Sequence, residues 1–155
     1  MKALCIIPCG KKKIWDADPH AGAVPAGEAY IGTLHKKSRT YAEKFCTDFR
    51  ILSAKHGFLR KEDILVANYD VSFHSPSAQR MSEEQLIEQY EEQGLSKYDY
   101  IIGLTGRKYR PYLEITAAKE QKIFYPLENI SGIGYILQEL QKAVDDNQPF
   151  PLEKE

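Results

Sequence analysis

Four short apolar runs mark the first level of order along the chain. Within each run the apolar residues are nearly continuous rather than alternating, which is typical of strands covered on both faces. The runs predict strands over Ala3–Ile7, Phe49–Leu52, Tyr98–Leu104 and Lys122–Tyr125. This pattern favours a parallel sheet that lies between layers of helices.

Apolar positions at helical spacing predict four helices between and after these strands. Two of the predicted starts carry a residue suited to capping the first turn, and a third has a proline, which the first turn of a helix tolerates. The predicted helices are Thr33–Phe45, one that begins after Ser82 with a capping box, one opened by Pro111, and one capped by Ser131.

The alternation of strands and helices predicts an α/β protein. We expect a single domain over residues 1–146, built as a Rossmann-like sandwich with a mostly parallel central sheet of about four to five strands. Two stretches, Trp15–Ala29 and His56–Ser77, are predicted to be long loops, and long loops in compact domains often carry function. Residues 147–155 are predicted to form a flexible tail.

Composition narrows the class of protein. The chain has 155 residues, 43% of them hydrophobic, and a net charge of −1, so it supports a packed core and does not predict nucleic-acid binding by bulk charge. There is no apolar run long enough to span a membrane, and the apolar run at the N-terminus is too short for a signal peptide. Three cysteines and four histidines show no zinc-site spacing, so we expect a cytoplasmic protein with reduced thiols and neither metal nor cofactor.

Glycines and cations follow three of the four predicted strands. In a parallel sheet the carboxyl ends of the strands meet at one edge, where ligands bind. Glycine lets backbone amides approach a ligand, and lysine and arginine attract anions. The segments Cys9–Lys13, Ser53–Gly57 and Thr105–Arg110 therefore predict a pocket for phosphate, either of a nucleotide or of a nucleic-acid backbone. The glycine-rich phosphate-binding motifs of other nucleotide-binding proteins are absent from the sequence.

Three residues are candidates for catalysis. Cys9 lies beside cations, which are expected to lower the pKa of its thiol and make it a nucleophile; the alternative is a small buried packing residue. Lys55 follows Ser53 by two positions, so both side chains point the same way in an extended backbone and can hold phosphate. Asp70 can act as a general base, bind a ribose hydroxyl, or simply form a turn.

A wider set of residues is predicted to bind the ligand. Its glycines would allow close approach, its cations would contact phosphate, and its tyrosines would stack on a base. Each has a plain alternative as a solvated or packing residue. The set comprises Gly10, Lys11, Lys13, Tyr30, Gly32, Ser53, Tyr69, Gly106, Arg107 and Tyr109.

Together these segments resemble the DUF6884 family of small bacterial and phage proteins, which is similar to the YaaA (DUF328) superfamily. The resemblance covers about residues 3–142, and its most specific part is ILSAKHGFL followed by Tyr69 and Asp70. His56 stands where the family usually has tyrosine, and Gly10 where it often has serine. The resemblance implies a role with nucleotides or nucleic acid, including base modification, but supplies no reaction. YaaA-like proteins are associated with DNA binding and stress protection, but their long segments outside the shared core have no room in 155 residues, so DNA binding by those segments is not implied.

Three hypotheses for function remain open. In the first, the protein is an enzyme of nucleotide or nucleobase modification that uses Cys9, Lys55, Asp70 and Tyr109. In the second, it is a non-catalytic protein that binds a nucleotide, DNA or RNA in the same pocket. In the third, it is an interaction subunit whose pocket has no ligand.

Overall fold

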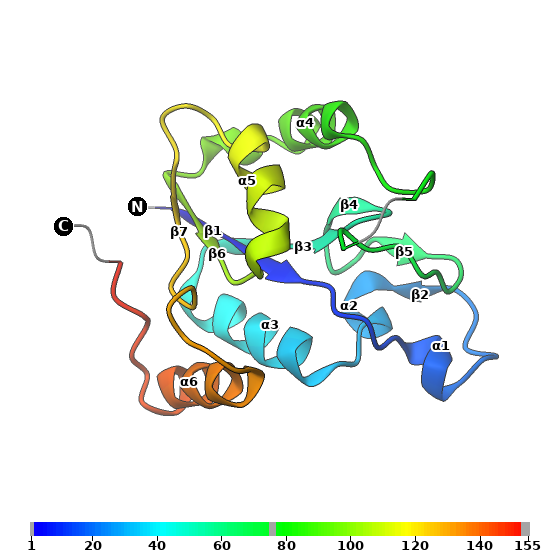
Figure 1. The fold of residues 1–155 in the computed structure, drawn as a ribbon, viewed down its shortest axis with the longest axis horizontal. Coiled ribbons are helices and arrows are strands. Elements are labelled where there is room, and N and C mark those ends of the chain that lie inside the picture. Colours follow the sequence, from blue (N-terminus) through cyan, green and yellow to red (C-terminus); the bar gives the residue numbers. More distant parts are fainter. Residues whose placement is uncertain (1, 75–76, 153–155) are drawn as a thin grey trace.

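A five-stranded sheet forms the centre of the computed structural model (Figure 1). The structure describes residues 2–74 and 77–152; residue 1, residues 75–76 of the second predicted loop and residues 153–155 of the predicted tail lie outside the described residues. The strand order is β4-β3-β1-β6-β7. The strands are β1 (Ala3–Pro8), β3 (Asp48–Ser53), β4 (Gly57–Leu59), β6 (Tyr100–Gly103) and β7 (Lys122–Phe124).

The four strands expected from the apolar runs are present and parallel. β1 pairs with β3 on one side and with β6 on the other, and β6 pairs with β7. All six residues of β1 are buried, which explains why its apolar run is continuous. The fifth strand, β4, is antiparallel to β3. The prediction of an α/β fold with a mostly parallel sheet is therefore confirmed, with one antiparallel pair at the edge.

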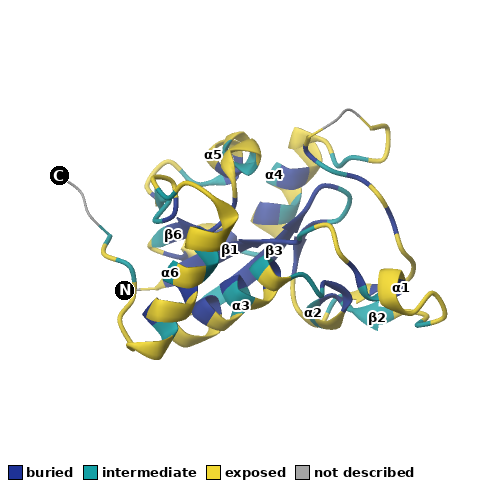
Figure 2. Cartoon of the chain, turned by 60° about the horizontal axis from the view of Figure 1, so that its bottom comes forward, coloured by how far each residue is buried: buried dark blue, intermediate teal, exposed yellow. Residues whose placement is uncertain are grey.

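Helices cover both faces of this sheet. In Figure 1, α3 (Thr33–Phe45) and α6 (Ile133–Asp145) lie on one side, and α4 (Glu83–Glu92) and α5 (Arg110–Thr116) lie on the other. Figure 2 shows the buried strands between helices whose outward positions are exposed. The predicted capping box of α4 is confirmed, as is a proline in the first turn of α5. The predicted Ser131 cap is wrong, because α6 begins after Gly132, whose φ of +94° suits glycine.

Both predicted long loops contain short elements of regular structure, so the predictions are wrong in those parts, whereas residues 66–74 of the second are irregular as predicted. The first holds α1 (Ile14–Ala17), β2 (Val24–Pro25) and α2 (Ala26–Ala29), and the second holds β4 and β5 (Ile64–Leu65). β2 and β5 pair into a small antiparallel sheet, extended by a 2.7 Å hydrogen bond from the Ala26 amide to the Asp63 carbonyl. Elements of two to four residues are too short to show a periodic pattern, and the short strands among them are defined by long-range pairing instead.

Part of the predicted tail contacts the domain. The ring of Phe150 stacks on Tyr41 with 4.9 Å between centroids, and its amide donates to the Tyr41 hydroxyl at 2.9 Å. The flexibility of residues 147–155 stays a prediction. Of the helices in residues 2–74 and 77–152, none combines the length and apolar character required to cross a membrane.

Candidate functional site

A cavity of about 490 Å³ lies at the carboxyl edge of the central strands. Part of its lining comes from the segment after β1, from Ala54 after β3, and from Tyr109 in the short 3-10 helix η2 (Arg107–Tyr109) beyond β6. Residues 69–74 form the remaining wall and supply six of its twelve lining residues. The segments after three parallel strands thus meet at one edge, where open α/β sheets bind ligands.

The turn after β1 directs this segment into the cavity. Gly10 has a φ of +81°, a conformation that glycine adopts without steric cost. His35, from the first turn of α3, is buried beneath it, and its Nδ1 donates to the carbonyl of Pro8 at 2.9 Å. The turn is therefore fixed from below by α3, and Cys9, Lys11 and Lys13 follow the cavity wall.

Lys13 brings a buried positive charge to this wall. The residue is 5% exposed, and its Nζ lies 4.4 Å from the centroid of the Tyr69 ring. The ammonium donates one hydrogen bond, to the carbonyl of Lys11 at 3.1 Å. Within the described part of the chain, no carboxylate lies within ion-pair distance of it. A buried ammonium without a counter-charge is uncommon and favours an anionic ligand.

A group of buried hydroxyls holds Tyr69 in place. The Tyr69 hydroxyl forms hydrogen bonds with the Tyr30 hydroxyl and with Ser53 Oγ, the latter at 2.9 Å. Ser53 Oγ also accepts the amide of His56 at 3.1 Å. Burial raises the pKa of Tyr69 to about 12 and also raises the pKa of Tyr30. Both phenols are therefore neutral at physiological pH, and they position the ring rather than carry charge.

Cys9 lies in the same wall, with Sγ 3.9 Å from the Tyr109 hydroxyl. Burial raises the pKa of the Cys9 thiol, although the Tyr109 hydrogen bond and the positive charge of Lys13 act in the opposite direction. The expectation of a lowered pKa is therefore wrong: Lys13 does lower the pKa of Cys9, but the residue is only 8% exposed and desolvation outweighs this effect. In the free protein Cys9 is a neutral thiol.

Aromatic rings form another part of the site, which we call the aromatic wall: Phe73 and Tyr109 line the cavity, and Tyr112 packs behind Phe73. Phe73 stacks on Tyr112 of α5 with 4.3 Å between centroids and meets Tyr109 edge-on at 5.2 Å. Sequence reasoning missed Phe73 and its neighbour His74, which both line the cavity. The signal that could have identified Phe73 is the alternation of Tyr69, Val71 and Phe73, which are all buried.

The other predicted site residues lie around the cavity rather than in its lining. Lys55 is half-buried, with Nζ 5.6 Å from the Tyr69 ring centroid. Arg107, the first residue of η2, is exposed. The predicted residues outside the lining are Tyr30, Gly32, Ser53, Lys55, Gly106 and Arg107, whereas Cys9, Gly10, Lys11, Lys13, Tyr69, Asp70 and Tyr109 belong to it.

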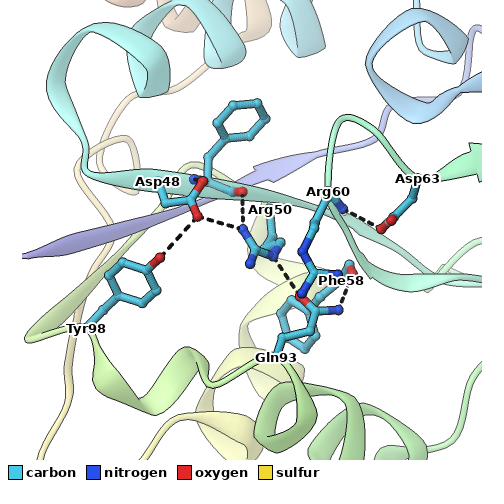
Figure 3. Close-up of polar contacts among 8 residues, drawn as sticks. Asp48, Arg50, Phe58, Arg60, Asp63, Gln93 and Tyr98 are labelled. Atoms are coloured by element: carbon cyan, nitrogen blue, oxygen red, sulfur yellow. Dashed lines mark hydrogen bonds and ion pairs between the residues drawn. The ribbon is translucent and has the colours of Figure 1, made fainter.

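A second cavity, of about 480 Å³, lies near the start of β3, and its most buried cation, Arg50, is paired with a carboxylate. Arg50 donates to Asp48 at 3.0 Å and to Gln93 at 2.6 Å, and Tyr98 donates to Asp48 at 3.1 Å (Figure 3). Burial opposes ionisation of Asp48, yet the bonds from Arg50 and from the Phe49 amide hold its pKa below the usual value. This network satisfies its own charges and supports the sheet.

Comparison with known proteins places the chain in a family. It is 46% identical over 146 residues to "Uncharacterized protein YfjM" of Bacillus subtilis (strain 168), and the aligned region covers 94% of this chain and 97% of that protein. Residues 4–142 match the family described as "Family of unknown function (DUF6884)". The chain therefore belongs to the DUF6884 family.

Proposed function

We propose that the cavity binds a nucleotide, with the phosphate at Lys13 and the base against the aromatic wall. The observation that carries this proposal is the buried ammonium of Lys13, which has no carboxylate partner among the described residues. A hydrogen bond to a charged group contributes about 1.5–3 kcal/mol, so an anion held here would gain measurable affinity. Lys11 lines the same wall and adds a second cation.

The aromatic residues of the cavity lining suit a planar, partly apolar group. Phe73 and Tyr109 offer ring surface, and base–aromatic stacking contributes about 1–3 kcal/mol per base. Asp70 lies exposed at the cavity and can accept hydrogen bonds from ribose hydroxyls. The cavity volume lies within the range of small-molecule sites. A nucleotide combines the anion, the sugar and the planar base that these three features fit.

A ligand panel tests this proposal. AMP, GMP, CMP and UMP are compared with adenosine and with inorganic phosphate, by thermal shift and by calorimetry. We expect at least one nucleotide to bind more tightly than either of its parts. Lys13→Met should weaken that binding at least tenfold, whereas Lys12→Met, which removes an exposed lysine outside the cavity lining, should not. Equal binding by wild type and Lys13→Met would contradict the proposal.

An enzyme of nucleotide or nucleobase modification is the second candidate, and the position of Cys9 favours it. The thiol lines the cavity beside the Tyr109 hydroxyl and is within the field of Lys13. A bound substrate that places an electrophile at Sγ and supplies a basic group to take the thiol proton would meet a nucleophile at Cys9, with the Tyr109 hydroxyl as a nearby hydrogen-bond donor. Cys9→Ser separates the two candidates: it should abolish turnover under the enzymatic proposal and leave nucleotide affinity nearly unchanged under the binding proposal.

Nucleic acid is the alternative form of the ligand, consistent with the resemblance to the YaaA superfamily. Exposed cations follow β1 and β6, among them Lys12, Arg107 and Lys108. Binding to DNA or RNA would weaken steeply with salt, because cations on the protein displace counterions from the phosphate backbone. Titration of a short oligonucleotide and of a mononucleotide at two salt concentrations distinguishes the two forms.

A further inference from the structure

Residues 66–74, which we call the strap, cross the cavity with little support from backbone hydrogen bonds. Among the described residues, no amide or carbonyl of the strap bonds to another backbone group. Its side chains alternate instead: Tyr69, Val71 and Phe73 are buried, whereas Asp70 and His74 are exposed. Side-chain packing therefore holds the strap in place, and segments of this kind open at low free-energy cost.

Residues 69–74 are the part of the strap that lines the cavity, and their two ends are held by different contacts. At one end, the Tyr69 hydroxyl is bonded to Tyr30 and Ser53 inside the domain. At the other end, Phe73 is held by ring contacts with Tyr109 and Tyr112, and its carbonyl accepts a long hydrogen bond of 3.5 Å from Arg80. The Tyr69 end is thus fixed by hydrogen bonds between buried hydroxyls, and the Phe73 end by ring packing and one long hydrogen bond.

The start of the strap is also loosely supported. Val66, Ala67 and Asn68 border a separate cavity of about 290 Å³, whose other wall includes Trp15. Val66 is 77% exposed, so it contributes little packing. Tyr69 is therefore the firm point of attachment between two weakly held ends.

We propose that the strap opens and closes over the ligand cavity, with Tyr69 as the fixed point and the Phe73–Tyr112 contact as the one that breaks. Opening removes one wall of the cavity and admits the ligand, and closing returns Phe73 to its place against the base. The identity of that ligand rests on the proposed function, whereas the motion of the strap does not. Its test can therefore begin without any ligand.

Cys9 reports the opening directly, because it lies in the cavity wall beneath the strap. N-ethylmaleimide labelling of the three cysteines is followed over time by peptide mass spectrometry. Cys5 is fully buried in β1 and reports global unfolding, and half-buried Cys46 provides a second reference. We expect wild-type Cys9 to be labelled faster than Cys5, since opening of the strap is easier than unfolding of the sheet.

Tyr112→Ala isolates the contact that holds the strap closed, because Tyr112 stacks on Phe73 without lining the cavity. We expect labelling of Cys9 to become about two- to tenfold faster, as loss of one aromatic pair predicts, with no change at Cys5. Tyr135→Ala, on the exposed side of α6, is the matched control and should change neither rate. Hydrogen exchange of the strap amides should rise in Tyr112→Ala in parallel.

Two results would overturn the proposal. The first is an unchanged Cys9 rate in Tyr112→Ala, and the second is a rise at Cys5 that equals the rise at Cys9. Phe73→Leu, which weakens the same contact with a smaller side-chain change, repeats the test if Tyr112→Ala does not fold. Addition of AMP, GMP, CMP or UMP to the wild type should slow Cys9 labelling for at least one of the four. If none has an effect while Tyr112→Ala still accelerates labelling, the motion stands and the proposed nucleotide is contradicted.

Discussion

The ammonium of Lys13 lies 4.4 Å from the centre of the Tyr69 ring, and both residues are at least nine-tenths buried. This contact joins the segment after β1 to the strap, so it connects the two main walls of the cavity. The ring offers a negative face to the cation but cannot neutralise it. The contact therefore holds the ammonium in position, but no carboxylate among the described residues neutralises its charge. This is the arrangement expected of a site that receives an anion.

Lys13→Met should leave the free protein as stable as the wild type or make it up to about 1 kcal/mol more stable. Burying an unpaired ammonium is unfavourable, and an apolar side chain of similar length removes that cost. Urea denaturation without ligand measures the free energy of unfolding. A loss of more than about 2 kcal/mol would instead assign Lys13 a structural role.

Tyr69→Phe should destabilise the protein by about 1–3 kcal/mol. The change removes the hydroxyl that bonds to Tyr30 and Ser53 and leaves buried polar groups with fewer partners. Tyr112→Phe is the matched control, because it removes the same hydroxyl from a half-buried ring that does not take part in the contacts among Tyr30, Ser53 and Tyr69. Equal midpoints of thermal unfolding for the two variants would show that the hydroxyl contacts contribute nothing.

Alkylation of Cys9 should depend on pH as expected for a thiol whose pKa is raised by burial. The rate, followed by mass spectrometry with iodoacetamide, should have its midpoint above the value of an ordinary cysteine, which is about 8.5. Lys13→Met should move the midpoint further up, because the positive charge of Lys13 lowers the pKa of Cys9. A midpoint near 7 in the free protein would mean that Cys9 is an activated nucleophile.

Stability should fall as the pH drops below about 6.5, partly because of His35. Burial lowers the pKa of His35 in the folded state, so the unfolded chain binds a proton more readily than the folded chain. The contribution of neutral His35 to stability is fully present above the pKa of histidine in the unfolded chain, which is about 6.5. It decreases as the pH falls from there toward the lower pKa of His35 in the folded protein. His35→Asn, whose amide can still donate to Pro8, should reduce this decrease; His20→Asn, at an exposed site, should not. Urea denaturation at pH 7.0 and 5.5 compares the three proteins.

The main layers of the fold could be predicted from the sequence, because the burial of a strand or helix determines the spacing of its apolar residues. The apolar run of Ala3–Pro8 reflects a strand covered on both sides, and the spacing in Thr33–Phe45 reflects a helix covered on one. Val24–Pro25 and Ile64–Leu65 leave no such trace, because each is two residues long and is defined by its partner. Long-range pairing of this kind is not encoded in local periodicity.

The candidate site was predictable only in part, for a related reason. Lys13 and Tyr69 stand next to recognisable strand ends or motifs, and both line the cavity. Phe73 lies in a stretch without regular structure, and its position depends on contacts with Tyr109 and Tyr112, far along the chain. The pKa of Cys9 was predicted in the wrong direction because its depth of burial cannot be seen in neighbouring residues.

The central claim is tested most directly by calorimetric titration of the nucleotide that binds most tightly among AMP, GMP, CMP and UMP into wild type, Lys13→Met and Lys12→Met. Nucleotide binding at the cavity predicts saturable binding to the wild type, a loss of at least tenfold in affinity for Lys13→Met, and unchanged affinity for Lys12→Met. The same affinity for all three proteins, or a loss in Lys12→Met alone, would contradict the assignment of this cavity as the nucleotide site.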